Sequence, residues 1–190
     1  MSVVAIPNWN SLGLLPPVDP ASPATGRTRS PYLVSLKDVV MRFATSAERN
    51  SVLIGLLRYR SALHALGVVS GFQWLDGSFM EDVETLEQRA PNDIDVVSFV
   101  HTPAGFPDPA ALRVLDHDAA KANFKVDAYF EELDRLPPDQ LTAASAYWYS
   151  LWAHRRNHVW KGFLQVDLAP GEDADALAWL NQHRSTGVGP

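Results

Sequence analysis

Leu75-Asp76-Gly77-Ser78 and Asp93-Ile94-Asp95-Val96, separated by 14 residues, say most about the architecture of this 190-residue chain. Apolar and β-branched residues precede the first segment and continue the second, which is typical of buried strands. The sequence therefore predicts strands at residues 68–75 and 94–100 and a third strand at 124–130. A short helix is predicted in the polar stretch between the first two strands, and further helices between the second and third.

Asp93 and Asp95 lie two residues apart at the start of a predicted strand. Because successive side chains of a strand point to opposite faces, these carboxylates face the same side, about 6.5–7 Å apart. At an effective dielectric constant near 20 they repel each other by roughly 2–3 kcal/mol, and a divalent cation turns this repulsion into attraction. Carboxylate oxygens suit Mg²⁺ or Mn²⁺ rather than zinc. We therefore predict a metal site at Asp93 and Asp95, with Asp127 on the third strand as a further ligand.

Gly77 and Ser78 stand where the first predicted strand gives way to a turn. Glycine lets the backbone approach a ligand closely, and the serine hydroxyl and nearby amides can donate to phosphate oxygens. A phosphate-sized turn beside two carboxylates meets the needs of a nucleoside triphosphate bound with Mg²⁺. The sequence thus predicts phosphoryl chemistry in which Gly77 and Ser78 bind the nucleotide. A pair of aspartates alone is weak evidence, since strand-edge aspartates commonly cap turns or meet solvent.

The remaining elements are predicted from caps and apolar spacing. Ser35 and Ser46 are predicted helix N-caps, and Gly67 is predicted to end the second of these two helices. A further helix, capped by Asp116 or Asp118, precedes the third strand. The other predicted elements are a short helix at 110–115, a helix from 139 to about 154, a strand at 160–168 and a helix at 171–183.

Proline and apolar residues distinguish the N-terminal segment. Residues 1–31 contain six prolines, which exclude a long helix or a central strand. They also contain Trp9, Leu14 and other apolar residues, so we expect an extended arm that packs on the rest of the protein. Residues 32–184 are predicted to form one domain with a C-terminal helical part, and residues 185–190 a frayed tail.

Composition limits the class of protein. With 46% hydrophobic and 20% charged residues, the chain has the composition of a soluble globular protein. Cysteine is absent, which excludes disulfides, thiolate zinc sites and a cysteine nucleophile. No apolar run approaches the roughly 18 residues of a membrane span and the N-terminus lacks the features of a signal peptide, so we expect a cytoplasmic protein without membrane contact. The net charge of −6 argues against sequence-independent binding of nucleic acid through a broad basic surface.

Cations are concentrated at residues 154–161, His-Arg-Arg-Asn-His-Val-Trp-Lys. We predict that Arg155, Arg156 and Lys161 bind the phosphates of a nucleotide or of an acceptor, because guanidinium forks and an ammonium both suit phosphate oxygens. The same residues could instead be the basic end of a helix, which the macrodipole favours. His154 and His158 are four residues apart and could share a helix face as metal ligands, although the glutamate of the H-E-x-x-H pattern is missing.

The two segments quoted first resemble the signature of the nucleotidyltransferase superfamily of the DNA polymerase β type. In that signature an apolar residue is followed by Gly and then by Gly or Ser; after a spacer come Asp, an apolar residue, Asp or Glu, and another apolar residue. Asp127 stands in the place of the third acid. Asp76 replaces the commoner apolar residue before the glycine, and the spacer from Phe79 to Asn92 is a little longer than usual.

The likeness extends over most of the chain up to about Phe130. Ile6-Pro7-Asn8-Trp9-Asn10 and Gly13-Leu14-Leu15-Pro16-Pro17, together with those segments, look like a bacterial family of stand-alone nucleotidyltransferase-like proteins. The resemblance implies a mixed β-sheet flanked by helices, similar to the polymerase β palm, within residues 32–184. It also implies Mg²⁺-dependent transfer of a nucleoside monophosphate from a triphosphate such as ATP to an acceptor hydroxyl, with release of pyrophosphate.

The resemblance gives roles to the three acids. Asp93 and Asp95 would bind the metal ions, and Asp127 would complete the acceptor-side metal and help to deprotonate the acceptor hydroxyl. The acceptor is left open as a protein, an RNA end or a small molecule, and a protein partner or a homo-oligomer is compatible with each. Some members of the superfamily have lost activity, so a non-catalytic binding or antitoxin-like protein is an alternative hypothesis. RNA binding through residues 154–161 is a third.

Overall fold

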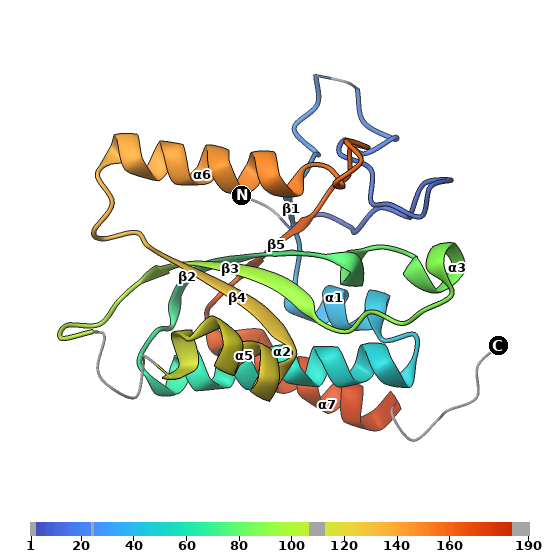
Figure 1. Ribbon diagram of the computed structural model, residues 1–190. Helices are drawn as coiled ribbons and strands as arrows, with labels where there is room; N and C mark the ends of the chain where they lie inside the picture. Colours follow the sequence, from blue (N-terminus) through green and yellow to red (C-terminus); the bar gives the residue numbers. More distant parts are fainter. Residues whose placement is uncertain (1–2, 24, 107–112, 184–190) are drawn as a thin grey trace.

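The computed structural model describes residues 3–23, 25–106 and 113–183. Within these ranges the chain forms a five-stranded sheet with helices on both faces (Figure 1). This confirms the predicted α+β class with a mixed sheet flanked by helices. The elements, in chain order, are β1 (Tyr32–Leu33), α1 (Leu36–Phe43), α2 (Ala47–Ala65), β2 (Ser70–Asp76), the 3₁₀ helix η1 (Ser78–Met80), α3 (Val83–Glu87), β3 (Ile94–His101), α5 (His117–Phe124), β4 (Val126–Glu132), α6 (Pro138–Trp152), β5 (Leu164–Asp167), the 3₁₀ helix η2 (Pro170–Glu172) and α7 (Asp173–His183).

The three strands that carry the predicted acids and the Gly-Ser turn are neighbours in the sheet. The strand order is β1-β5-β2-β3-β4, in which β2 pairs antiparallel with both β3 and β5, and β3 pairs parallel with β4. The register places Asp95 of β3 opposite Asp76 of β2 on one side and opposite Asp127 of β4 on the other. Three aspartates therefore form a row across adjacent strands.

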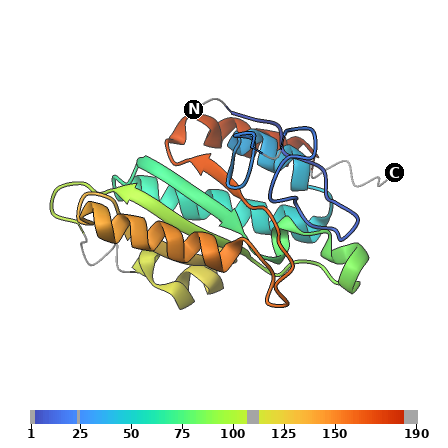
Figure 2. The same cartoon turned by 90° about the horizontal axis from the view of Figure 1, so that it is seen from above.

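Side chains on the two faces of the sheet build two separate cores. Helices α1, α2, α5 and α7 lie against one face, and α6 lies along the other (Figures 1 and 2). Val96 of β3 belongs to the larger core on the first face. Val97 packs with Trp74 and with Trp148 of α6 on the second face. Because strand side chains alternate, Asp95 points to the α6 face, one pleat beyond the Trp74 and Val97 pair.

Capping residues explain where the helices begin. The hydroxyls of Ser35 and Ser46 accept hydrogen bonds from the backbone amides three residues later, at the starts of α1 and α2. The carboxylate of Asp116 caps α5 in the same way, so Asp116 and not Asp118 is the cap of this helix. Both serine caps predicted from the sequence are confirmed.

The N-terminal arm contacts the segment that follows the Gly-Ser turn. The indole Nε1 of Trp9 donates to the carbonyl of Met80 at 2.8 Å, and the amide of Asp82 donates to the carbonyl of Gly13 at 2.9 Å. Leu14 and Leu15 of the arm are each 1% exposed. The arm thus helps to hold η1 and α3 in place.

Several predicted boundaries differ from the structure. The helix expected to reach residue 154 ends at Trp152, because the chain then turns back in a short antiparallel bridge between His154 and Trp160. The strand expected at 160–168 is correspondingly limited to β5. The helix expected at 110–115 falls largely outside the described residues, and the expected tail at 185–190 falls wholly outside them. None of the described helices is both long and apolar enough to cross a membrane.

Candidate functional site

Asp95 lies at the centre of a group of four carboxylates. Asp76 and Asp127 flank it in the sheet, and Asp93, just before β3, shares Lys121 with Asp127. Burial, followed by the negative charges of Asp76, Asp127 and Asp93, raises the pKa of the Asp95 carboxyl to about 7. Within the described part of the chain, the carboxylate of Asp95 is the one in this group that makes no hydrogen bond or ion pair. The site therefore contains a partly buried acid whose charge is opposed by three like charges.

Gly77 forms a wall of the site against Asp95. Its backbone lies at φ 87° and ψ −175°, a conformation that glycine adopts far more readily than other residues. A Cβ at this position would lie 2.9 Å from Cγ of Asp95 and 3.0 Å from each of its carboxylate oxygens. The backbone of the predicted phosphate-binding turn thus lies directly on the central carboxylate, and a side chain at residue 77 has no room.

A buried arginine fixes the segment after this turn. Arg49 of α2 is fully buried and donates to the carbonyl oxygens of Phe79 at 2.7 Å and Glu81 at 2.6 Å. It also forms a two-point ion pair with the carboxylate of Glu84 at 2.6 and 2.8 Å. Hydrogen bonds to a charged donor are the stronger kind. Arg49 therefore anchors η1, which begins with the half-buried Ser78.

At the β2 end of the row, the acid is paired with a buried lysine. The ammonium of Lys161 lies 2.6 Å from both carboxylate oxygens of Asp76 and 3.6 Å from Glu81. Desolvation raises the pKa of Asp76 to about 6, and Lys161 limits that rise. Arg155 forms an ion pair with the same Glu81 and lies 3.2 Å from Glu87. Two of the three predicted phosphate-binding cations are thus engaged by carboxylates of the chain itself.

At the β4 end of the row, the acids are paired with side chains of α5. The ammonium of Lys121 lies 2.9 Å from Asp93 and 3.1 Å from Asp127, and so bridges two carboxylates. The imidazole Nε2 of His117 contacts the other oxygen of Asp127. Hydrogen bonds to Asp93 and Asp127 hold the pKa of Lys121 above its ordinary value, and those to Asp118 and Asp127 raise the pKa of His117.

The structure brings some of the predicted site residues together and separates others. Asp93, Asp95, Asp127 and Gly77 meet at one end of the sheet, with Ser78 next in the chain. Arg156 is exposed, and its side chain makes no hydrogen bond or ion pair with any residue that the structure describes. The predicted histidine pair does not share a helix face, because both residues lie beyond the end of α6 at Trp152; their ring centroids are 5.6 Å apart.

The sequence analysis gives no role in the site to three of its residues. Asp76 enters it only as a departure from a signature, whereas it is the third member of the aspartate row. His117 and Lys121 do not enter it at all. Their four-residue spacing on a helix that leads directly into the strand of Asp127 is the signal that could have indicated them, because such a spacing puts two side chains on one helix face.

The ligand atoms of the site are of the kind that a divalent cation prefers, but their side chains do not converge on one point. Among the residues that the structure describes, no three His, Cys, Asp or Glu side chains converge so as to hold a metal ion. The four aspartates of the site nevertheless supply carboxylate oxygens, which suit Mg²⁺ or Mn²⁺, and the imidazole of His117 lies against one of them. The unpaired, partly buried Asp95 is the group that a cation would stabilise most, since its charge is opposed by its neighbours. The donor set therefore fits the predicted metal.

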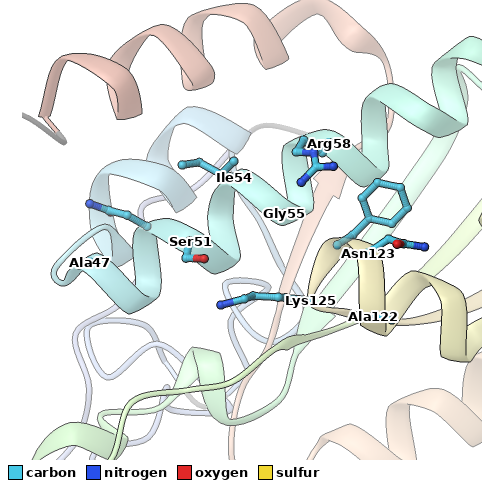
Figure 3. A pocket seen from close by; sticks show the side chains of 10 residues that line it. Ala47, Ser51, Ile54, Gly55, Arg58, Ala122, Asn123 and Lys125 are labelled. Atoms are coloured by element: carbon cyan, nitrogen blue, oxygen red, sulfur yellow. The ribbon is translucent and has the colours of Figure 1, made fainter.

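A separate groove lies between α2 and the end of α5 (Figure 3). Its volume is about 460 Å³, and none of the four carboxylates lines it. The carbonyl of Phe124 approaches α2 at Gly55, where an added Cβ would lie 1.8 Å from that oxygen. This contact holds α5 against α2 independently of the ion pairs of Lys121 and His117.

Comparison with known proteins places the chain in a family but gives it no activity. The chain matches a family of unknown function, DUF6932, over residues 7–167, and therefore belongs to that family. No curated protein and no solved structure matches it.

Proposed function

We propose that this member of the DUF6932 family is a Mg²⁺-dependent nucleotidyltransferase with a polymerase β-like palm, which transfers a nucleoside monophosphate from a triphosphate to an acceptor hydroxyl. The observation that supports the proposal is the aligned row of Asp76, Asp95 and Asp127, with Asp93 beside it and the backbone of Gly77 packed on the central carboxylate. A site that gathers acids next to a glycine turn suits an anionic substrate that arrives with its own cations.

The proposed transfer breaks a phosphoanhydride bond of the triphosphate and forms a phosphoester bond to the acceptor. The acceptor oxygen forms a bond to the α-phosphorus, the bond from that phosphorus to the bridging oxygen of the β-phosphate breaks, and pyrophosphate leaves with the electron pair. The proton of the acceptor hydroxyl has to be accepted by a base. Bound through Asp93, Asp95 and Asp127, Mg²⁺ would supply neutralisation of phosphate charge and a lowered pKa of the acceptor hydroxyl.

The protein's own residues would position the substrate and accept the proton. The amides of the fixed turn at Gly77 and Ser78 would donate to oxygens of the β- and γ-phosphates, since Arg49 holds this turn from behind. The carboxylate of Asp127, which is 17% exposed, would take the acceptor proton and pass it to solvent through the exposed His117. Arg156 remains available for phosphate or acceptor binding.

The test of this function is release of pyrophosphate from each of the four nucleoside triphosphates in the presence of Mg²⁺ and of an acceptor hydroxyl supplied by RNA, protein or small molecules. We expect turnover by the wild-type protein and none by Asp95→Asn or by Asp93→Ala combined with Asp95→Ala. Asp134→Asn is a matched control, because Asp134 is 48% exposed and contacts His101 at the opposite end of β3. Turnover that survives in both site variants would refute the roles given to these acids.

The alternative, a non-catalytic protein that acts through a protein partner, is favoured by one observation. Arg155, Lys161 and Lys121, which could serve a triphosphate, are all engaged by carboxylates of the chain. This hypothesis expects stable copurification with a second protein and no pyrophosphate release with any nucleotide or acceptor. Measurable turnover by the isolated chain would exclude it.

A further inference from the structure

Resting on the proposed function, we propose that Lys121 and a divalent cation are alternative occupants of the same carboxylates. The ammonium lies 2.9 Å from Asp93 and 3.1 Å from Asp127, which are two of the three proposed metal ligands. An ammonium and a divalent cation repel each other, so the two compete for these carboxylates. Binding of the metal therefore releases Lys121 from the site, and Lys121 lowers the affinity of the protein for the metal.

Lys121 can leave the carboxylates easily, because its side chain is 46% exposed. The side chains of its partners Asp93 and Asp127 are 24% and 17% exposed. A lysine carries its charge on a flexible stem and regains hydration when it turns outward. Ion pairs of this exposure contribute little to stability. Exchange for a metal therefore costs the protein little.

The ion pairs of Lys121 are not needed to hold α5 in place. Ala120 of this helix is completely buried, and the carbonyl of Phe124 rests on α2 where Gly55 leaves room for it. Helix α5 is also joined directly to β4, so its position follows from packing and from the chain itself. Removal of the ammonium should leave the carboxylates where they are, with one competing cation fewer.

The proposal can be tested by titrating the metal-free protein with Mn²⁺, followed by electron paramagnetic resonance or calorimetry. We expect Lys121→Met to bind Mn²⁺ about three- to tenfold more tightly than wild type, since an exposed ion pair of modest strength is removed from the competition. Lys125→Met is the matched control: Lys125 is exposed, ends α5, and has no ion pair with these acids among the described residues. Its affinity for Mn²⁺ should stay close to that of wild type.

A second readout follows the lysine itself. Acylation of Lys121 by an amine-reactive ester, measured by mass spectrometry after digestion, should increase when Mg²⁺ is added to wild type. It should stay unchanged with Mg²⁺ in Asp95→Asn, if that variant no longer binds the metal. The labelling of Lys125 in the same sample gives the reactivity of an exposed lysine for comparison.

The possible outcomes separate this proposal from the proposed function. If neither wild type nor Lys121→Met binds Mn²⁺, the metal site fails and both proposals fall. If wild type binds Mn²⁺ and Asp95→Asn does not, the site stands; equal or weaker binding by Lys121→Met would then overturn the role of Lys121 alone. An equal gain in Lys121→Met and Lys125→Met would also overturn it, because the effect would reflect only the net charge.

Discussion

Two lysine–aspartate pairs stand at opposite ends of the same row, and they differ in burial. The side chains of Asp76 and Lys161 at the β2 end are 3% and 7% exposed, whereas those of Asp127 and Lys121 at the β4 end are 17% and 46% exposed. The chemistry of the two pairs is the same. Loss of one buried partner leaves an uncompensated charge out of water, whereas loss of an exposed partner leaves a charge that solvent can reach. We therefore regard the first pair as structural and the second as exchangeable.

The variant Lys161→Met tests most directly whether the buried pair is structural. We expect a loss of about 3–5 kcal/mol in the free energy of unfolding, because Asp76 then remains buried without its cation. Urea unfolding at neutral pH measures this loss. The double variant Lys161→Met with Asp76→Asn should recover much of it, and a loss below about 1 kcal/mol in the single variant would contradict a structural role.

Gly77→Ala tests the contact that lies between the two pairs. We expect a loss of about 2–3 kcal/mol in stability, from the positive φ of 87° and from the overlap of the new Cβ with the carboxylate of Asp95. Gly105→Ala is the control, since Gly105 has a φ of +83° but nothing within 4 Å of the position that a Cβ would take. Equal losses in the two variants would show that the contact with Asp95 adds nothing.

The pH dependence of stability tests the crowding of charge around Asp95. The pKa of Asp95 is about 7 in the folded protein and 3.8 in the absence of perturbation, so the folded protein binds this proton more tightly than the unfolded chain. The contribution of Asp95 to stability should then fall as the pH rises from about 4 to about 7. In EDTA, the gain in stability of Asp95→Asn over wild type should be larger at pH 8 than at pH 5 by about 2–3 kcal/mol. A gain that does not change with pH would mean that the acid is well compensated.

The smallest effect is expected for Lys121→Met. Because this ion pair is largely exposed, the free energy of unfolding should change by less than about 1 kcal/mol. Urea unfolding of this variant beside Lys161→Met compares the two ends of the row directly. Similar losses in both would remove the distinction between a structural and an exchangeable pair.

Much of the fold follows from local sequence. Caps such as Ser35 and Asp116 and the apolar runs of β2 and β3 predict their elements, because these signals act over a few residues. The order of the strands and the two-residue β1 could not be predicted in this way, since both depend on partners far along the chain.

In the candidate site, too, the features set by neighbouring residues could be predicted and those set by distant residues could not. The spacing of Asp93 and Asp95 places both on one face without any tertiary information. The pairing of Asp76 with Lys161 spans 85 residues, so no local pattern reveals it. Each of the two residues is unusual in its own setting, an acid where the signature has an apolar residue and a lysine among apolar neighbours, and such a pair of anomalies is the signal that could have joined them.

Under the proposed function, the contacts of the arm would make the first residues of the chain contribute to the position of the substrate-binding turn. Because Trp9 and Gly13 are bonded to the segment that follows the Gly77 turn, a cut or a bulky fusion near residue 10 would act on the position of Gly77 without touching any acid. If a truncated protein lost activity, the cause would then be a displaced Gly77 turn and not the loss of a reactive group. A separate peptide of residues 3–23 that restored turnover to such a truncated chain would make the arm a removable control element.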